Sequence, residues 1–512
     1  MNKPLRFAVV ASLLVAAPVA ASVAAPVSAR LVPPQTVAAR PDVTAGSDAG
    51  GAVAVDPPRA PQAEPARSTV SVEGLPPFVA EDIPLRVVPD AQLPQRVGRI
   101  GLTPTAVATT NGIVGYRHRK TGVVHDHPVI QATHIMGWLE SYRATGDSRY
   151  LRLAVKNADH LLGYADRSHG ALFFGYHFDF ALHGEDRWTL RAPWYSGMAQ
   201  GQALSALLRL HDATGDPRWA EAADATFASF TRPRTPDEPW VTDVLPGGSL
   251  WLEEYAGTLH DRAYNGHNFG LFGIYEYWRE TQNPEAATIL RGAMTATLDR
   301  AEEIRVPGEV SRYCLEHDER SEKYHAIHVR QLNAIAGFSG DRRFAHLADA
   351  LLEDAPAAFQ GGPGELARGA HVLLRKSPSG KVAEVRRITR ADARHVRYDA
   401  RERIDGRTGV WLRMADGPYR GEWVRERPRR AFVTGVSEVV EFPGTRPAIL
   451  AAGAHTGRSA EAHGPTRTVV LERPSRAPAL RRVLIDGRPH VQLGAGAFAG
   501  MYVPLDDRVS LD

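Results

Sequence analysis

Two tyrosines lie close to histidines in a pattern that could support proton transfer. Tyr313 precedes His317 by four residues, and Tyr324 directly precedes His325, with His328 one helical turn further on. A phenol is a poor acid in water, with a pKa of about 10. Positive neighbours favour its phenolate, and hydrogen-bonded neighbours help it to pass a proton. Tyr313 and Tyr324 are therefore candidates for an acid and a base. The alternative is a pair of half-buried aromatic side chains with satisfied hydroxyl groups.

Further polar and aromatic residues gather where we expect helices to begin. Trp194 and Gln200 open one such helix, Glu254 and Tyr255 end the link before the next helix, and Asn265 opens that helix. Packing of an apolar core does not explain this mixture, because a buried polar group needs a hydrogen-bond partner. The alternative is that the polar residues are helix caps and that Trp194 belongs to the core.

The helix that begins near Tyr324 brings several candidates together. At about 100° per residue, Tyr324, His328, Gln331 and Ile335 fall within one narrow helix face. The polar residues form the upper part of this face and Ile335 its apolar base. Such a face is suited to the lip of a pocket.

A repeated pattern of paired helices must position these residues. Each repeat is a helix, a tight polar turn and a second amphipathic helix, and the four turns are Gly146–Asp147, Gly215–Asp216, Gln282–Asn283 and Gly340–Asp341. Glycine provides a left-handed helix stop, and Asp or Asn caps the helix that follows. Because each pair must bury its apolar face against the next pair, we predict a helical domain at 127–360. Its expected architecture is an (α/α) toroid of about four helix pairs, and an open helical solenoid is the alternative.

Strand-like alternation replaces the helical pattern at 370–512. Ile404–Arg407 and Ile485–Arg488 share the sequence Ile-Asp-Gly-Arg, and each leads into a strand, a glycine turn, an aromatic residue and a second strand. This internal repeat predicts a duplicated small β-barrel-like domain, so the expected fold class is mainly α with an all-β tail. Arginines are dense at 375–430, which predicts either attraction of polyanions or an ordinary solvated surface.

The N-terminal region has the features of a secretory signal at 1–29. Lys3 and Arg6 give it a basic start, an apolar run follows, and small residues come after that run. We therefore expect a secreted, periplasmic or cell-envelope protein, with an uncleaved membrane anchor as the alternative. A disordered Pro/Ala-rich tether is expected at 30–71, and an irregular, partly stranded segment at 72–126.

Composition adds two limits on function. A chain of 512 residues can form two or three domains, and its net charge of only +3 gives no indication of a partner. With a secretory signal, we expect no nucleic-acid partner. Cys314 is the only cysteine, which excludes an intramolecular disulfide, and we expect it to be a small buried residue rather than a nucleophile.

Five motifs in the helical region occur in an order that resembles a known family. They are W-Y-S-G-M-A-Q-G-Q at 194–202, L-E-E-Y at 252–255, Y-N-G-H-N-F-G-L-F-G-I-Y-E at 264–276, R-Y-C-L-E-H at 312–317 and Y-H-A-I-H-V-R-Q-L at 324–332. Over about 127–351 the chain resembles the C-terminal catalytic domain of the D-glucuronyl C5-epimerases, which invert uronic acid residues within heparan-type polysaccharides. The resemblance implies the same toroid of helix pairs.

The resemblance also implies roles for individual residues. The essential tyrosines of the family match Tyr255, Tyr313 and Tyr324, and its accompanying glutamate matches Glu254. Epimerisation at C5 needs a proton-transfer group on each face of the sugar, and Tyr313 and Tyr324 would supply them. Tyr255 and Glu254 would hold the substrate or tune a phenol. The expected substrate-binding residues are Trp194, Gln200, Asn265, His317, His325, His328 and Gln331.

One departure from the family pattern concerns substrate binding. Glu316 stands where the family has an arginine suited to clamp the uronate carboxylate. Arg187, Arg262, Arg312 and Lys323 are candidates to replace that arginine. We expect no cofactor, and we predict no metal site, because the histidines at 125, 127, 325 and 328 lack a third well-spaced ligand.

The predicted function is a secreted uronate C5-epimerase that acts on an anionic, uronic-acid-containing polysaccharide. Two alternatives stay open: a polysaccharide lyase or glycoside hydrolase on the same toroid, and a non-catalytic glycan- or envelope-binding protein. The arginine-rich β-domain is the candidate for binding a cell-envelope glycan. Monomer and dimer are both compatible with the sequence.

Overall fold

The computed structural model describes most of the chain from Pro65 onward. The predicted signal at 1–29, and the predicted tether as far as residue 64, lie outside the described residues. At Arg67–Val70 the chain forms strand β1 rather than part of a tether. The described ranges are 65–105, 107–118, 120–356, 361–377, 381–391, 394–404, 406–459 and 464–512.

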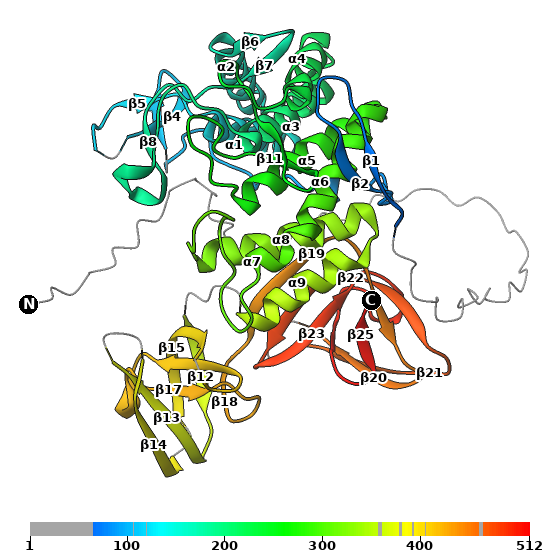
Figure 1. Ribbon diagram of the computed structural model, residues 1–512. Helices are drawn as coiled ribbons and strands as arrows, with labels where there is room; N and C mark the ends of the chain where they lie inside the picture. Colours follow the sequence, from blue (N-terminus) through cyan, green and yellow to red (C-terminus); the bar gives the residue numbers. More distant parts are fainter. Residues whose placement is uncertain are drawn as a thin grey trace, which may run out of the picture. The chain divides into compact units, whose positions relative to one another are not determined.

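The predicted helix pairs are present in the described residues. The pairs, shown in Figure 1, are α1 (Pro128–Thr145) with α2 (Ser148–Gly163), α3 (Gly197–Thr214) with α4 (Pro217–Phe227), α5 (Tyr264–Thr281) with α6 (Pro284–Asp299), and α8 (Glu322–Ser339) with α9 (Arg342–Asp354). A short helix, α7 (Ala301–Ile304), precedes the last pair.

The predicted turns between paired helices are confirmed. Gly146, Gly215 and Gly340 end the first helix of their pairs with φ of 70°, 67° and 69°, and Gln282 takes the same left-handed conformation at 54°. The next residue in each turn then caps the second helix, as Asn283 does by accepting two backbone N–H bonds at the start of α6. These local signals explain why the helix pairs could be located from the sequence.

The first helices of successive pairs pack against one another. Helix α3 contacts both α1 and α5, and α5 contacts α8. The approach of α3 and α5 depends on glycine: a Cβ at Gly273 would lie 2.2 Å from the carbonyl oxygen of Gly201. No side chain fits at that distance, so the two helix backbones touch here.

Short strands precede and connect the helix pairs. Before α1 they are β1, β2 (Phe78–Glu81), β3 (Ala108–Thr110), β4 (Ile113–Arg117) and β5 (Val124–His125). Between the pairs they are β6 (Asp166–Ser168), β7 (Ala171–Phe173), β8 (Phe180–Ala181), β9 (Thr189–Leu190), β10 (Thr242–Leu245) and β11 (Ser249–Leu252). The links between α2 and α3, α4 and α5, and α7 and α8 carry the residues of the candidate site.

The C-terminal part of the chain is all-β and begins at residue 362, somewhat before the predicted position 370. Its first sheet contains β12 (Gly362–Leu366), β13 (Gly369–Lys376), β14 (Val382–Ala391), β15 (Arg394–Arg403), β16 (Val410–Met414), β17 (Trp423–Arg425) and β18 (Ala431–Val433). Its second sheet contains β19 (Val436–Leu450), β20 (Gly453–Arg458), β21 (Thr466–Leu471), β22 (Ser475–Ile485), β23 (Arg488–Leu493), β24 (Tyr502–Pro504) and β25 (Val509–Leu511).

The two sheets have the same antiparallel strand order. It is β14-β13-β17-β16-β15-β12-β18 in the first sheet and β21-β20-β24-β23-β22-β19-β25 in the second. Each strand of the first sheet therefore has its counterpart seven positions later in the order of strands along the chain. The two Ile-Asp-Gly-Arg segments lead into strands that correspond in this order, β16 and β23.

Several arginines of the first sheet are already paired with carboxylates. Arg375 and Arg386 both contact Glu422, at 3.2 and 2.7 Å, and Arg413 contacts Asp399 at 2.7 Å. These pairs reduce the positive charge that the sequence alone would assign to this surface. Within the described residues, we find no helix with the length and apolar character needed to cross a membrane.

Candidate active site

The four predicted catalytic residues come together in the structure. Tyr255 follows β11, Tyr313 lies in the link before α8, and Tyr324 lies in the first turn of α8. The hydroxyl oxygens of Tyr255 and Tyr313 are 2.8 Å apart, and the Tyr313 hydroxyl donates to Oε2 of Glu254 at 3.4 Å. The ring centroids of Tyr313 and Tyr324 are 4.4 Å apart. The structure thus forms one cluster of three phenols and a carboxyl group.

Backbone hydrogen bonds fix Tyr313 from both sides. Its N–H donates to the carbonyl of Glu319 at 2.7 Å, and its carbonyl accepts from the N–H of Tyr264 at 3.0 Å. Because Tyr264 is the first residue of α5, the link that carries Tyr313 is attached to that helix start. A similar pair of backbone bonds joins Tyr195 to Ala256, next to Tyr255.

The adjacent glutamates Glu253 and Glu254 have different roles. Glu253 accepts backbone N–H bonds from Tyr255, Asp261 and Arg262 at 3.0, 3.4 and 3.2 Å, so its carboxyl group holds the link together. Burial raises its pKa to about 7. The Glu254 carboxyl group contacts Tyr313 instead, and its Oε1 atom has no hydrogen-bond partner among the described residues.

Burial controls the protonation of this cluster. The pKa of Glu254 is raised to about 8, first by burial and then by the charge of Asp261. Burial, together with the Glu254 carboxyl group, also raises the pKa values of Tyr255, Tyr313 and Tyr324 above the usual value for a phenol. The phenols are therefore neutral at physiological pH. Because its pKa is raised, the Glu254 carboxylate is a stronger proton acceptor for them than an ordinary carboxylate.

Trp194 forms part of an aromatic wall beside Tyr255. Its ring stacks on Tyr176, with centroids 3.8 Å apart, and its indole N–H donates to the carbonyl of Phe178 at 2.9 Å. Phe180 stacks parallel to Tyr255 with centroids 6.1 Å apart. Trp194 is only 4% exposed, so in this structure it packs as a wall residue, with little surface left for stacking on a sugar.

Gln200 and His325 hold neighbouring segments in place. The Gln200 amide accepts from the N–H of Phe174 at 2.9 Å and donates to the carbonyl of Leu172 at 2.7 Å. His325 Nδ1 accepts from the N–H of Ser311 at 3.0 Å, and its Nε2 lies 3.1 Å from the carbonyl of Ala355. Neither side chain joins the tyrosine cluster, because its polar atoms are already bonded to backbone groups.

His328, Asn265 and Gln331 form a second buried polar group. Gln331 donates to the backbone carbonyl of Asn265 at 2.8 Å, and His328 Nδ1 lies 3.0 Å from the hydroxyl of Ser311. Three side-chain atoms have no hydrogen-bond partner among the described residues: His328 Nε2, Asn265 Oδ1 and Gln331 Oε1. The predicted polar face of α8 is therefore present, and these atoms are available for further hydrogen bonds.

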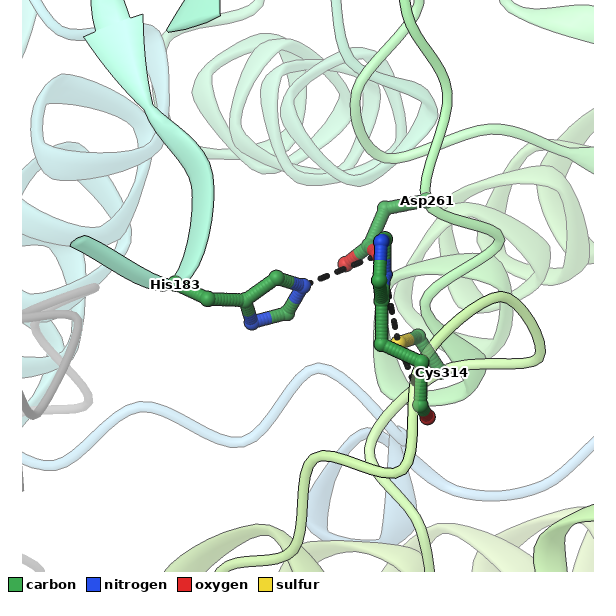
Figure 2. A group of neighbouring side chains, drawn as sticks. His183, Asp261 and Cys314 are labelled. Atoms are coloured by element: carbon green, nitrogen blue, oxygen red, sulfur yellow. Dashed lines mark hydrogen bonds and ion pairs between the residues drawn. The ribbon is translucent and has the colours of Figure 1, made fainter. Parts of the chain in front are cut away.

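His317 belongs to a cluster centred on Asp261. Figure 2 labels the other members of this cluster, His183, Asp261 and Cys314. His317 Nδ1 lies 2.7 Å from Asp261 Oδ1, and His183 Nε2 lies 3.0 Å from the same oxygen. The Cys314 thiol is 3.7 Å from His317 Nδ1. Burial would raise the pKa of Asp261, but hydrogen bonds from His183 and His317 outweigh burial and lower it to about 2.

Sequence analysis did not identify His183 as a functional residue. It lies 78 positions before Asp261 and enters the cluster through a link that shares no motif with the Asp261 link. No spacing rule connects two such distant positions. Only the packing of the links brings them together.

The arginines proposed as replacements for the carboxylate clamp already have acidic partners. Arg262 binds Glu316 at 2.8 Å, Arg312 binds Asp318 at 3.0 Å, and Arg187 lies 3.7 Å from Glu185. Glu316 itself is therefore neutralised by Arg262 rather than left as an unpaired negative charge. The Lys323 ammonium lies 5.2 Å from the centroid of the Tyr324 ring, and burial lowers its pKa. Lys323 is thus the cation of this set that directly adjoins the tyrosines.

A helical domain that gathers buried phenols around a carboxyl group has the components of a proton-transfer enzyme. Comparison with known families narrows this class. Residues 167–352 match the family described as "D-glucuronyl C5-epimerase C-terminus". The resemblance predicted from the five motifs is therefore confirmed over this range.

A curated relative supports the same assignment. The D-glucuronyl C5-epimerase of Caenorhabditis elegans is 26% identical over 183 residues, which cover 32% of this chain and 29% of the relative. The chain thus aligns with less than a third of the length of that relative. The family match lies within the helical domain.

Several solved structures share a limited likeness with the chain. Cellobiose 2-epimerase from Spirochaeta thermophila is 15% identical, with 44% of this chain and 57% of that chain covered and a TM-score of 0.32. Unsaturated glucuronyl hydrolase from Bacillus sp. GL1 is 18% identical, with 45% and 62% covered and a TM-score of 0.32. The α-mannanase from Bacteroides thetaiotaomicron is 11% identical, with 57% and 70% covered and a TM-score of 0.34. At TM-scores this low, none of them carries a conclusion about this chain.

Proposed function

We propose that this protein is a polysaccharide uronate C5-epimerase that uses tyrosines to remove and return the C5 proton. The observation that carries the proposal is the 2.8 Å contact between the Tyr255 and Tyr313 hydroxyls, with Glu254 beside them and the Tyr324 ring against Tyr313. The family match over 167–352 supports the same reaction class. The proposal includes closure of the helix pairs into a toroid and a duplicated barrel-like origin for the two sheets.

The reaction breaks the C5–H bond of a uronic acid residue in the polysaccharide. One phenol, ionised by loss of its proton, takes the C5 proton, and the electron pair passes into the carboxylate as an enediolate. The other phenol then donates its proton to C5 from the opposite face, so the carbon is inverted. Tyr313 and Tyr324 hold these two positions in the proposal, and the two phenols exchange roles in the reverse direction.

Glu254 and Tyr255 prepare Tyr313 for this task. A buried neutral phenol is a weak acid, so it must pass its proton to a neighbouring group before it acts as a base. Glu254, whose nearer oxygen is 3.4 Å from the Tyr313 hydroxyl, can accept that proton in its ionised form, and its pKa of about 8 makes this form more abundant as the pH rises toward 8. The Tyr255 hydroxyl provides a hydrogen bond that favours the resulting phenolate.

The proposed substrate is an anionic polysaccharide that contains uronic acid, encountered outside the cytoplasm after export directed by residues 1–29. The reaction uses no cofactor in this proposal. An envelope glycan is the proposed partner of the arginine-rich β-domain, through those arginines that are not paired with carboxylates.

Solvent-isotope exchange tests the proposed reaction. Each candidate uronan is incubated with the protein in heavy water, and deuterium at C5 is measured by mass spectrometry. We expect incorporation together with a mixture of the two C5 epimers. Absence of exchange on every uronan tested, with a well-folded protein, would contradict the proposal.

The same samples distinguish the two alternative enzymes. A lyase also removes the C5 proton but expels the C4 substituent, so its unsaturated product absorbs in the ultraviolet. A hydrolase creates new reducing ends without deuterium at C5. The structure disfavours a hydrolase built on Glu253 and Glu254, because backbone N–H groups already occupy the Glu253 carboxyl group.

A further inference from the structure

Four side chains beside the tyrosines form a mixed donor set that the proposed reaction does not use. They are His183, Asp261, Cys314 and His317, and one ligand atom from each lies within 4.8 Å of the others. The donors come from three links that are far apart in the sequence: before α3, before α5 and before α8. Imidazole nitrogen, carboxylate oxygen and thiolate sulfur are the ligands that zinc-like cations prefer.

Asp261 is the centre of this donor set. Its side chain is fully buried, and Oδ1 is contacted by both His183 and His317. Its second oxygen, Oδ2, is buried and has no hydrogen-bond partner among the described residues. A buried carboxylate is costly unless a cation or several hydrogen bonds compensate it. An unused oxygen on a buried carboxylate, surrounded by imidazoles and a thiol, therefore points to a cationic ligand.

The neighbouring cation does not meet this need. Arg262, the residue next to Asp261, extends its guanidinium to Glu316 at 2.8 Å. The two histidines bond to Oδ1 and leave Oδ2 without a partner among the described residues. Neutral imidazole is a strong ligand for a metal cation.

We propose that His183, Asp261, Cys314 and His317 form a binding site for a divalent transition-metal cation of the zinc class. The proposal does not depend on the epimerase reaction. In a tetrahedral zinc site the ligand atoms are separated by about 3.2–3.8 Å, as follows from metal–ligand distances of about 2.0–2.3 Å. The observed separations of 2.7, 3.0 and 3.7 Å need only a small outward shift of the two imidazoles.

Figure 2 supports this geometry. The ring of His183 points directly at the Asp261 carboxyl group, and Cys314 approaches from a different segment of the chain. The side chains of His183 and His317 are 11% and 21% exposed, so a cation could enter from the side of the imidazoles. The bound cation would join three links and place a positive charge near Tyr313, whose ring centroid is 5.9 Å from that of His183.

Binding of Co²⁺ to the full-length protein tests the site. Tetrahedral Co²⁺ gives visible d–d bands, and a cobalt–thiolate bond adds an ultraviolet charge-transfer band. Cys314 is the only cysteine of the chain, so this charge-transfer band reports that residue alone. We expect both signals to saturate at one Co²⁺ per chain and to disappear when Zn²⁺ is added. A folded protein that shows no charge-transfer band would overturn the proposal.

Variants then distinguish Co²⁺ binding at the cluster from adventitious Co²⁺ binding elsewhere on the protein. Cys314→Ser should abolish the charge-transfer band, and His183→Gln should keep the band but weaken Co²⁺ binding at least about 10-fold. His260→Gln is the matched control, because His260 lies next to Asp261 in the sequence but outside the donor set. The control should bind Co²⁺ as the parent protein does. Equal weakening by His183→Gln and His260→Gln would refute the site, and circular dichroism verifies that each variant is folded.

Discussion

The Tyr313 hydroxyl lies at the junction of two hydrogen bonds. It is 2.8 Å from the Tyr255 hydroxyl and 3.4 Å from the Glu254 carboxyl group. A phenol donates one hydrogen bond and also accepts, so Tyr313 can donate to Glu254 while it accepts from Tyr255. The three groups therefore form a short chain along which a proton can pass, with Tyr313 in the middle.

Replacing Tyr313 by phenylalanine removes the hydroxyl at this junction. We expect Tyr313→Phe to lower C5 exchange by at least about 100-fold, the lower end of what a positioned acid or base contributes. Deuterium incorporation measures this loss. Tyr275→Phe is the control, because within the described residues the buried Tyr275 hydroxyl bonds to backbone groups of Arg86 and Val88 and to no catalytic candidate. The control should lose about 1 kcal/mol of stability and retain its activity. Wild-type exchange in Tyr313→Phe would exclude this tyrosine as the acid or base.

Replacing Glu254 by glutamine should raise the stability of the protein and lower its activity. Its pKa is about 8 when folded, so the folded state binds the proton more tightly than the unfolded chain does. This group therefore contributes stability at low pH, and that contribution is lost as the pH rises from about 4.5 to about 8. At pH 8 the buried Glu254 carboxylate therefore destabilises the folded state. Glu254→Gln removes this charge, and we expect the variant to be about 1–3 kcal/mol more stable at pH 8.

Urea unfolding at pH 8 and at pH 5 tests this prediction, since the gain should shrink at pH 5, where the unfolded carboxyl group is also partly protonated. C5 exchange should fall because the amide cannot accept the Tyr313 proton. A variant that is less stable than the parent at both pH values would contradict the predicted effect of burial.

At the scale of elements, the tyrosine cluster depends on the packing of helices that carry no catalytic side chain. Helices α3 and α5 approach so closely at Gly201 and Gly273 that their backbones touch. The start of α5 in turn holds the link with Tyr313, through the bond from the Tyr264 N–H. A change in the distance between these helices should therefore displace the link that carries Tyr313.

Gly273→Ala tests this dependence. The new Cβ would lie 2.2 Å from the Gly201 carbonyl oxygen, so the helices must separate. We expect a loss of about 1–3 kcal/mol, which exceeds the gain of about 1 kcal/mol in helix propensity. Gly163→Ala is the control, since a Cβ added at Gly163 would have no atom within 4 Å and the substitution should be neutral or stabilising. Equal unfolding midpoints for the two variants would contradict the close approach.

At the scale of the whole molecule, buried neutral histidines should make the protein sensitive to acid. Burial lowers the pKa values of His127, His267 and His328 to about 3, 4 and 3. His267 shows the reason: its Nδ1 accepts from the Leu252 N–H, and protonation would destroy that bond. The unfolded chain binds these protons near pH 6.5, so stability is complete above that pH and is lost as the pH falls toward 3.

We expect each of these histidines to cost about 1.4 kcal/mol between pH 7.5 and pH 5.5. Glu253 and Glu254, whose pKa values are raised to about 7 and about 8, shift stability in the opposite direction over this range, so the histidine contribution is measured as a difference between two proteins. Urea unfolding, followed by far-ultraviolet circular dichroism, should show that His267→Gln loses about 1.4 kcal/mol less stability than the parent when the pH falls from 7.5 to 5.5. An equal change in the two proteins would show that His267 is not neutral when folded.

The second sheet also contributes to the helical domain. Strand β19 packs along α8, and its residue Arg446 bonds to Asp349 of α9 at 3.0 Å. The helix that carries Tyr324 is therefore supported on one side by a strand of the β-domain. This contact joins the two kinds of fold within the described part of the chain.

The sequence by itself determined the helix pairs, the β repeat and the identity of the catalytic candidates. Glycine stops, Asp and Asn caps and helical periodicity act between near neighbours, so the four turns could be read directly. The five ordered motifs indicated Tyr255, Tyr313, Tyr324 and Glu254, which the structure brings together.

Only the tertiary structure decided how distant side chains meet. It showed that Gln200 and His325 hold backbone segments, that Arg262 neutralises Glu316, and that His183 reaches Asp261 across 78 positions of the chain. These contacts depend on how whole helices and links pack, and no local spacing encodes that packing. The tyrosines were thus recognisable from their sequence neighbours, whereas the donor set around Asp261 exists only because three links converge.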